Sequence, residues 1–129
     1  MISRAVYQKF ASGLTGASFV EQWGGLVAKV GGKVFAMWGE RDGDAGHIVF
    51  KVNETSFEIL TAVDGVAQAP YFAKGKWVVV APGALPQGDI EHYTAASHAT
   101  VAASLTKKLQ RELGLLPPNE CIDLYPRRV

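Results

Sequence analysis

The sequence predicts an α+β fold, a single compact domain in which helices pack on an antiparallel β-sheet. Two apolar, extended runs flank Gly31-Gly32 within residues 26–38, and a glycine pair supplies the positive φ angles that a tight two-residue hairpin turn requires. In residues 47–53 every second side chain, at Ile48, Phe50 and Val52, is apolar and points to one side, which is the two-residue period of a strand. Residues 90–113 instead repeat apolar side chains every four residues, which predicts a helix.

Length and composition fit one soluble domain. With 129 residues, 48% of them hydrophobic, the chain can bury one core but is too short for two ordinary domains. Its 13 Lys and Arg against 12 Asp and Glu leave a formal charge of +1, so any site for nucleic acid must be a local cluster of cations. The single cysteine, Cys121, cannot form an internal disulfide, which favours a reducing compartment. Because neither a signal peptide nor a long apolar run is evident, we expect a cytoplasmic protein that does not bind membranes.

The first part of the chain predicts a helix and then three strands. Residues 1–14 form an amphipathic helix with Ser3 as its N-cap and with Val6 and Phe10 on one face. Residues 18–23 alternate as a strand that leads into the hairpin. A tight hairpin turn places Ala28 opposite Phe35 and Leu26 opposite Met37. The core face of this hairpin then consists of Leu26, Ala28, Val30, Phe35 and Met37.

The second part of the chain predicts two further strands and two helices. Residues 39–46 are rich in glycine and charge and form a loop, and residues 47–53 form the next strand. Thr55 and Glu58 have the spacing of a capping box, so a helix starts there and stops at Asp64-Gly65. Residues 76–81 are rich in valine and predict another strand. Asp89 caps a final helix over residues 90–113, which Gly114 ends.

These boundaries place the domain at residues 1–114. Residues 115–129 contain two adjacent prolines and form a C-terminal tail that packs on the domain or on a partner.

The chain carries no recognisable catalytic or metal-binding motif. His92 and His98 are six residues apart, whereas a helical pair of metal ligands is four apart. The glycine pairs lie in hairpin turns rather than between a strand and a helix, where a nucleotide-binding loop would lie. We therefore expect a protein that is not an enzyme, with no catalytic residues, no metal and no cofactor.

Two features suggest a binding surface. Residues 69–77 interleave aromatic side chains with Lys74 and Lys76, and aromatic rings beside cations can stack bases and neutralise phosphates. The alternative is that these aromatic rings close the edge of the core while the lysines extend into solvent. Lys107, Lys108 and Arg111 form a second group, which either faces phosphates or complements the helix dipole, with Lys108 paired to Glu112.

The order of these motifs resembles the MmcQ/YjbR family. The landmarks are the sequences QWG at residues 22–24, VGGKVFA at 30–36, APY at 69–71, KW at 76–77 and LTKKL at 105–109. The resemblance covers residues 2–113 and implies an α+β fold that has been compared with a double-wing DNA-binding arrangement. The chain departs from the family pattern at Thr106, where a proline is common, and at His98, where a tyrosine is frequent. Without that proline we expect the last helix to be more continuous.

The residues and the resemblance together predict a non-catalytic DNA-binding protein. Since the isoelectric point is near 7.9, DNA binding should be weak and depend steeply on salt. The predicted contacts are Lys29, Lys33, Lys74, Lys76, Trp77, Lys107, Lys108 and Arg111. The alternative prediction is a small-molecule or protein-binding domain that uses an aromatic patch. The residues of that patch are Trp23, Tyr71, Phe72 and Trp77.

Overall fold

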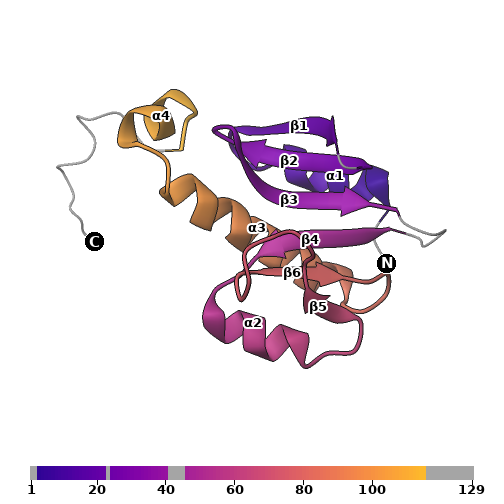
Figure 1. Cartoon of the computed structure of the whole chain (residues 1–129). Coiled ribbons are helices and arrows are strands. Elements are labelled where there is room, and N and C mark those ends of the chain that lie inside the picture. The colour runs from indigo at the N-terminus through magenta and orange to yellow at the C-terminus, as the bar shows by residue number, and fades with distance from the viewer. Residues whose placement is uncertain (1–2, 23, 41–45, 116–129) are drawn as a thin grey trace.

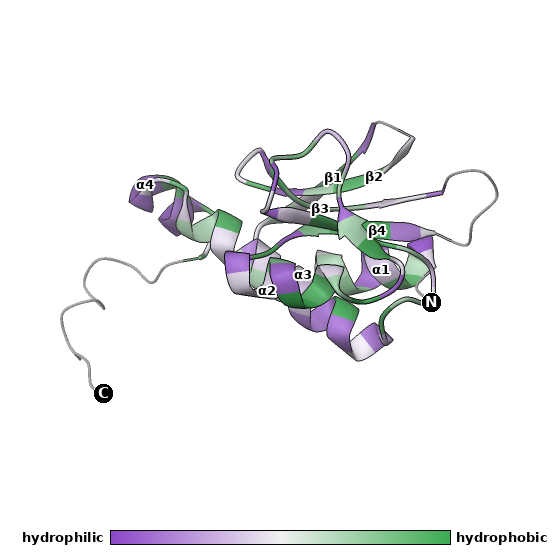
Figure 2. Ribbon diagram, turned by 60° about the horizontal axis from the view of Figure 1, so that its bottom comes forward, coloured by the Kyte–Doolittle hydropathy of each residue, from purple (hydrophilic) through white to green (hydrophobic). Residues whose placement is uncertain are grey.

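The computed structural model describes residues 3–22, 24–40 and 46–115, and its strands form one six-stranded antiparallel sheet in the order β1-β2-β3-β4-β6-β5. The strands are β1 (Ala17–Gln22), β2 (Gly25–Val30), β3 (Lys33–Gly39), β4 (His47–Lys51), β5 (Val66–Gln68) and β6 (Trp77–Val80). The helices are α1 (Arg4–Ser12), α2 (Glu54–Thr61), α3 (Gln87–Ala103) and α4 (Lys107–Glu112). Helices α1, α2 and α3 lie on the same side of the sheet (Figures 1 and 2). The predicted α+β class is confirmed.

The hairpin between β2 and β3 turns at Gly31-Gly32 as predicted, but its register contains a β-bulge. Val30 pairs with Lys33, whereas Ala28 pairs with Ala36 and Val27 with Met37. Phe35 is the additional residue on β3. The predicted pairs of Ala28 with Phe35 and of Leu26 with Met37 are therefore wrong, because a bulge sets two residues of one strand against one of the other.

The bulge also changes which side chains of β3 enter the main core. Phe35 and Ala36 are adjacent in sequence, yet both are fully buried on the face that the helices cover. Trp38 then joins this core, while Met37 packs on the opposite face. The predicted core face of the hairpin is thus correct for Leu26, Ala28, Val30 and Phe35 and wrong for Met37.

The two faces of the sheet carry two apolar clusters of different size. The helix-covered face holds the main core, whose largest fully buried side chains include Tyr7, Phe35, Phe50 and Ile48. The other face holds a smaller cluster of Val49, Ala69 and Trp77, against which Val34, Met37, Phe72 and Val79 pack. The residues between β5 and β6 supply Ala69 and Phe72 to this smaller cluster, so this connection folds over the face opposite to α1, α2 and α3.

Two helix starts show how short polar side chains set element boundaries. Ser3 caps α1 as predicted, and its hydroxyl accepts a hydrogen bond from the Val6 amide at 3.2 Å. The buried residues of α1, however, are Tyr7 and Ala11, which pack in the main core, rather than Val6 and Phe10. The Tyr7 hydroxyl also donates to the Leu26 carbonyl.

The N-cap of helix α2 lies two residues before the predicted cap, Thr55. Its N-cap is Asn53, whose side-chain oxygen accepts from the Ser56 amide at 2.8 Å. Thr55 therefore lies inside the helix, because Asn53 already occupies the capping position directly after β4 and Val52.

The predicted single helix over residues 90–113 is wrong, because the chain breaks between α3 and α4. Thr106 has an extended conformation (φ −63°, ψ 153°), and its side chain accepts from the Leu109 amide as the N-cap of α4. Helix α3 also begins earlier than predicted, with Pro86 as its N-cap and Asp89 in its first turn. Strand β5 was not predicted, and it is only three residues long.

In the part of the chain that the structure describes, no helix combines the length and the apolar character that crossing a membrane requires.

Candidate nucleic-acid interface

The antiparallel register brings lysines from β3, from β4 and from the residue before β6 to one end of the sheet. Lys33 begins β3 directly after the hairpin turn, and β4 runs back beside β3 to end at Lys51. Lys51 pairs with Trp77 at the start of β6, so Lys76 lies at the same end. Neighbouring strands are about 4.8 Å apart, which leaves Lys33 and Lys76 separated by about two strand spacings. This is the left-hand end of the sheet in Figure 1.

Helix α4 adds a second group of cations to this end, next to the last residues of α3. Helix α3 ends beside the hairpin turn, where the Lys33 ammonium donates to the Ser104 hydroxyl at 3.3 Å. Gly31 in the turn is so close to the junction of α3 and α4 that a Cβ there would lie 2.6 Å from Leu105 Cδ1. Helix α4 therefore presents its cations near the same turn. We call the whole set the cationic end: Lys29, Lys33, Lys51, Lys74, Lys76, Lys107, Lys108 and Arg111.

Acidic residues gather at the opposite end of the sheet. Glu21 lies at the end of β1, Glu40 directly follows β3, and Asp64 precedes the start of β5. Asp89 and Glu91 lie near the start of α3, which begins after β6 has run to this end. A chain with a net charge of only +1 thus separates much of its charge between two ends.

The cations of the cationic end are not neutralised by ion pairs within the described residues. The ion pair that the described residues do contain lies away from the cationic end and joins Arg4 of α1 to Glu21 of β1. Lys108 and Glu112, whose pairing belonged to the alternative interpretation of this cation group, form no ion pair in the described part of the chain. Glu54 and Glu112 are the acidic residues nearest to these lysines in the chain, and both are exposed.

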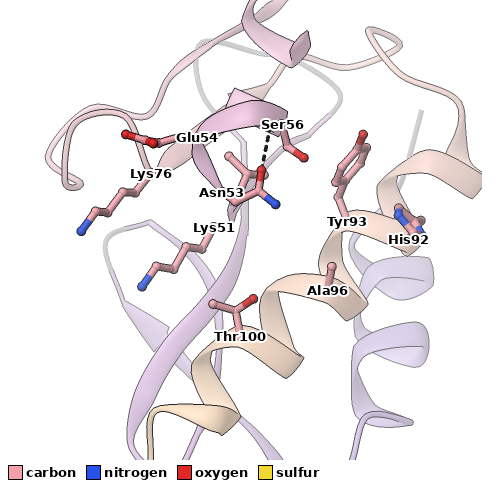
Figure 3. A pocket seen from close by; sticks show the side chains of 10 residues that line it. Lys51, Asn53, Glu54, Ser56, Lys76, His92, Tyr93, Ala96 and Thr100 are labelled. Carbon is pink, nitrogen blue, oxygen red and sulfur yellow. Dashed lines mark hydrogen bonds between the residues drawn. The ribbon is translucent and has the colours of Figure 1, made fainter. Parts of the chain in front are cut away.

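A pocket of about 370 Å³ lies at the cationic end between the start of α2 and the middle of α3. Figure 3 shows the side chains of Lys51 and Lys76 extending to the same side of this pocket, away from Tyr93. We call it the lysine pocket. Its lining residues are Lys51, Val52, Asn53, Glu54, Ser56, Lys76, His92, Tyr93, Ala96 and Thr100.

Hydrogen bonds hold the backbone of both lysines in the pocket. The Lys51 amide donates to the Ser97 hydroxyl of α3 at 2.9 Å, and the Lys76 carbonyl accepts from the Val52 amide at 2.8 Å. The first turn of α2 also faces this region, and helix N-termini favour anions. Chemically, the pocket offers two ammonium groups and hydroxyl donors to an anion, opposed by the carboxylate of Glu54.

Sequence reasoning missed Lys51 as a member of this site. The alternation of residues 47–53 assigned Lys51 to the polar side of a strand, without indicating which other cations lie near it. The signal that could have found it is its position two residues before Asn53, because a lysine at the end of a strand that precedes a capped helix lies close to the helix N-terminus.

A second pocket, of about 450 Å³, opens on the sheet face opposite to α1, α2 and α3. We call it the Tyr71 pocket. It is lined by Met37, His47, Val49, Pro70, Tyr71, Phe72 and Val79. Six of these side chains are apolar or aromatic, so the pocket is suited to a flat apolar surface rather than to a phosphate.

The predicted aromatic patch is only partly brought together. Trp77 is 9% exposed and packs against Phe72 with their ring centroids 4.7 Å apart, so it belongs to the core as the alternative interpretation expected. Its predicted role as a direct contact of DNA or ligand is therefore not supported by its burial. Tyr71, in contrast, is fully exposed, and Phe72 lines the pocket beside it. Trp23 lies outside the described residues.

The histidines are dispersed over three different environments. His98 is buried, with its Nε2 at 2.7 Å from the Thr15 carbonyl oxygen and its ring edge-on to Phe35. His47 lines the Tyr71 pocket and His92 the lysine pocket. The described residues include no group of three or more His, Cys, Asp or Glu that could hold a metal ion.

Comparisons with known proteins show the same fold in two solved structures. Residues 12–100 match the model of the YjbR family. The Deinococcus radiodurans protein DR2400, which has a DUF419 domain, is 22% identical and superposes with a TM-score of 0.80 over 90% of this chain and 91% of its own. A protein from Pseudomonas syringae is 17% identical, with a TM-score of 0.63 over 74% of this chain and 96% of its own. No curated protein matches the chain significantly.

Proposed function

The chain belongs to the YjbR family, and we propose that it is a non-catalytic DNA-binding protein whose cationic end contacts the phosphate backbone. The observation that supports this most directly is the gathering of cations from β2, β3, β4, α4 and the connection before β6 at one end of an almost neutral molecule. Phosphates attract such a cluster even where the net charge of the protein is small, because screening restricts the interaction to about 10 Å.

The lysine pocket is the part of this surface that is best suited to hold a phosphate. Lys51 and Lys76 extend to the same side, and both have their backbone groups held by hydrogen bonds. These hydrogen bonds fix where each lysine side chain leaves the backbone, so only the side chains themselves must be ordered when they meet a phosphate. Lys33 and the cations of α4 lie further along the same end, where they would contact neighbouring phosphates.

The expected affinity is modest. Binding that depends on phosphate contacts alone has dissociation constants of roughly 10⁻⁴ to 10⁻⁶ M at physiological salt and weakens as salt rises. The protein should therefore show little sequence preference through this surface, because phosphates carry no direct sequence information.

Fluorescence anisotropy with labelled DNA at several salt concentrations tests the proposal. We expect binding at low salt and a linear fall of the logarithm of the association constant with the logarithm of salt concentration. The double variant Lys51→Gln/Lys76→Gln should reduce the steepness of that line by about 2 if each lysine contacts one phosphate. Lys9→Gln, on the exposed surface of α1, is the matched control and should leave the line unchanged.

Two results would contradict the proposal. One is the absence of binding to any DNA at low salt. The other is binding whose salt dependence is the same in the wild type, the double variant and the Lys9→Gln control.

A further inference from the structure

Tyr71 combines full exposure with a backbone conformation that its side chain disfavours. Its φ is 70°, and among the described residues it is the non-glycine residue with a positive φ. A tyrosine in this left-handed region costs about 1 kcal/mol or more. Its ring is fully exposed, so burial does not offset that cost. Strain of this kind concentrates at functional sites.

The side chain of Gln68 holds the backbone on both sides of Tyr71. Its amide nitrogen donates to the carbonyls of Ala69 at 2.8 Å and Phe72 at 3.3 Å, while its oxygen accepts from the Gly75 amide at 2.9 Å. The Ala69 amide also donates to the Trp77 carbonyl at 3.1 Å. The exposed ring of Tyr71 is therefore carried by a well-braced connection.

The Tyr71 pocket has an apolar floor beside this ring. The floor consists of Met37, Val49 and Val79 from three neighbouring strands, and Phe72 packs on Trp77 at its side. A flat ring that enters the pocket would therefore meet apolar side chains below and the aromatic surface of Tyr71 at the rim. At about 450 Å³, the pocket lies within the ordinary size range of ligand sites.

The Tyr71 pocket adjoins the cationic end through the chain itself. Lys74 and Lys76 follow Tyr71 on the same connection, and both are exposed. A ligand that carries flat rings and phosphates along one flexible backbone would be able to place a ring in the pocket and a phosphate on these lysines. Nucleic acid has this chemistry.

We propose that the Tyr71 pocket receives one unstacked nucleobase, so that the protein binds single-stranded DNA more tightly than duplex DNA. The inference rests on the proposed function, since the phosphates that flank the base contact the cationic end. Bases of a duplex are paired and stacked on both faces, so they are not free to enter the pocket. Aromatic side chains stack on free bases with little sequence preference.

Three labelled probes of equal length test this inference by fluorescence anisotropy at low salt. They are a thymidine 12-mer, a 12-mer in which abasic sites replace the central bases, and a 12-base-pair duplex. We expect the wild type to bind the thymidine 12-mer about tenfold more tightly than the abasic probe, in line with the contribution of one stacked base. Tyr71→Gly should lose this preference, while Tyr71→Phe, which keeps the ring, should retain it.

The variant Tyr71→Gly is suited to this test because it should fold. Glycine adopts a φ of 70° without steric cost, and the tyrosine ring makes no buried contact that the substitution would remove. Circular dichroism confirms the fold before binding is measured.

The possible outcomes separate this inference from the proposed function. If no probe binds at low salt, both are overturned. If all three probes bind equally, with affinities that fall in Lys51→Gln/Lys76→Gln but not in Tyr71→Gly, only the inference is overturned. Binding of free thymidine monophosphate that depends on Tyr71, without binding of any 12-mer, would overturn it in favour of a small-molecule site.

Discussion

The hydroxyl of Ser97 donates a 2.6 Å hydrogen bond to the carbonyl of Phe35, the bulged residue of β3. The same hydroxyl accepts from the Lys51 amide at the end of β4. One fully buried side chain of α3 thus joins the helix to two neighbouring strands. It also positions the backbone of a lysine that lies in the proposed phosphate site.

Replacing Ser97 by alanine should reduce the free energy of unfolding by about 2 kcal/mol, because it leaves two backbone groups without their partner in a buried region. Urea denaturation monitored by circular dichroism measures the change. Ser12→Ala is the control, since the Ser12 hydroxyl bonds the Lys9 carbonyl on the exposed surface and should contribute less than about 0.5 kcal/mol. Equal losses in the two variants would show that the buried hydroxyl of Ser97 has no special role.

Tyr7 should make the protein sensitive to alkaline pH. Burial raises the pKa of the Tyr7 phenol well above its ordinary value of about 10, and the backbone of Ala28, which hydrogen-bonds the phenol oxygen, partly opposes the shift. The protonated phenol is favoured in the folded state, so its contribution to stability is complete below pH 10 and is lost as the pH rises from there toward the folded-state pKa.

The variant Tyr7→Phe separates this effect from general alkaline unfolding. It should lose about 1 kcal/mol at neutral pH, because the hydrogen bond to the Leu26 carbonyl disappears, and should then show a shallower decline above pH 10. Urea denaturation at pH 7 to 11 measures both quantities. Parallel declines in the wild type and the variant would exclude Tyr7 as the cause.

The two glycines of the hairpin turn should differ in their tolerance of alanine. Both have positive φ angles, 59° at Gly31 and 82° at Gly32, so both substitutions carry a similar backbone cost. At Gly31 a Cβ would also lie 2.6 Å from Leu105 Cδ1, whereas at Gly32 nothing lies within 4 Å. Gly31→Ala should therefore be more destabilising by about 1 to 3 kcal/mol. Thermal unfolding of both variants measures the difference, and a similar melting temperature would mean that Leu105 moves freely.

Thr106 should determine whether α4 is helical. Thr106→Ala removes the N-cap hydrogen bond to the Leu109 amide and should cost about 1 kcal/mol. Amide hydrogen exchange at residues 109–113 should accelerate by about fivefold. Thr55→Ala is the matched control, because Thr55 lies within α2 and Asn53 supplies its cap. Exchange in α4 that stays at the wild-type rate would argue against a capping role for Thr106.

Local signals in the sequence were sufficient to predict the hairpin turn and several boundaries of helices and strands. The hairpin at Gly31-Gly32, the N-cap at Ser3 and the strand that starts at His47 each depend on residues within a few positions of one another. Such signals act in the same way whatever the rest of the chain does. The fold class followed from their order.

The bulge and the helix break depend on contacts between distant residues. The Phe35 carbonyl is bonded by Ser97, which is 62 residues away, so the register of β3 cannot be read from β3 alone. The side chains of Leu105 and Leu109 both approach Gly31. The two leucines contact the same glycine although the helix is interrupted before α4. Their four-residue spacing therefore predicted one continuous helix that the structure does not contain.

The residue types of the candidate site were predictable, but their arrangement was not. The sequence identified lysines on separate segments, and only the strand register showed that Lys33, Lys51 and Lys76 share one end. The aromatic run at residues 69–77 gave no sign that Trp77 is buried while Tyr71 is exposed, because that difference arises from the turn between them.

The separation of charge between the two ends of the sheet has a consequence for the approach to a polyanion. A molecule of almost zero net charge gains little speed by simple attraction, but one with opposite poles experiences a torque in the field of DNA. The positive pole would turn toward the duplex or strand before contact, so that a larger share of encounters begin with Lys51 and Lys76 facing the phosphates.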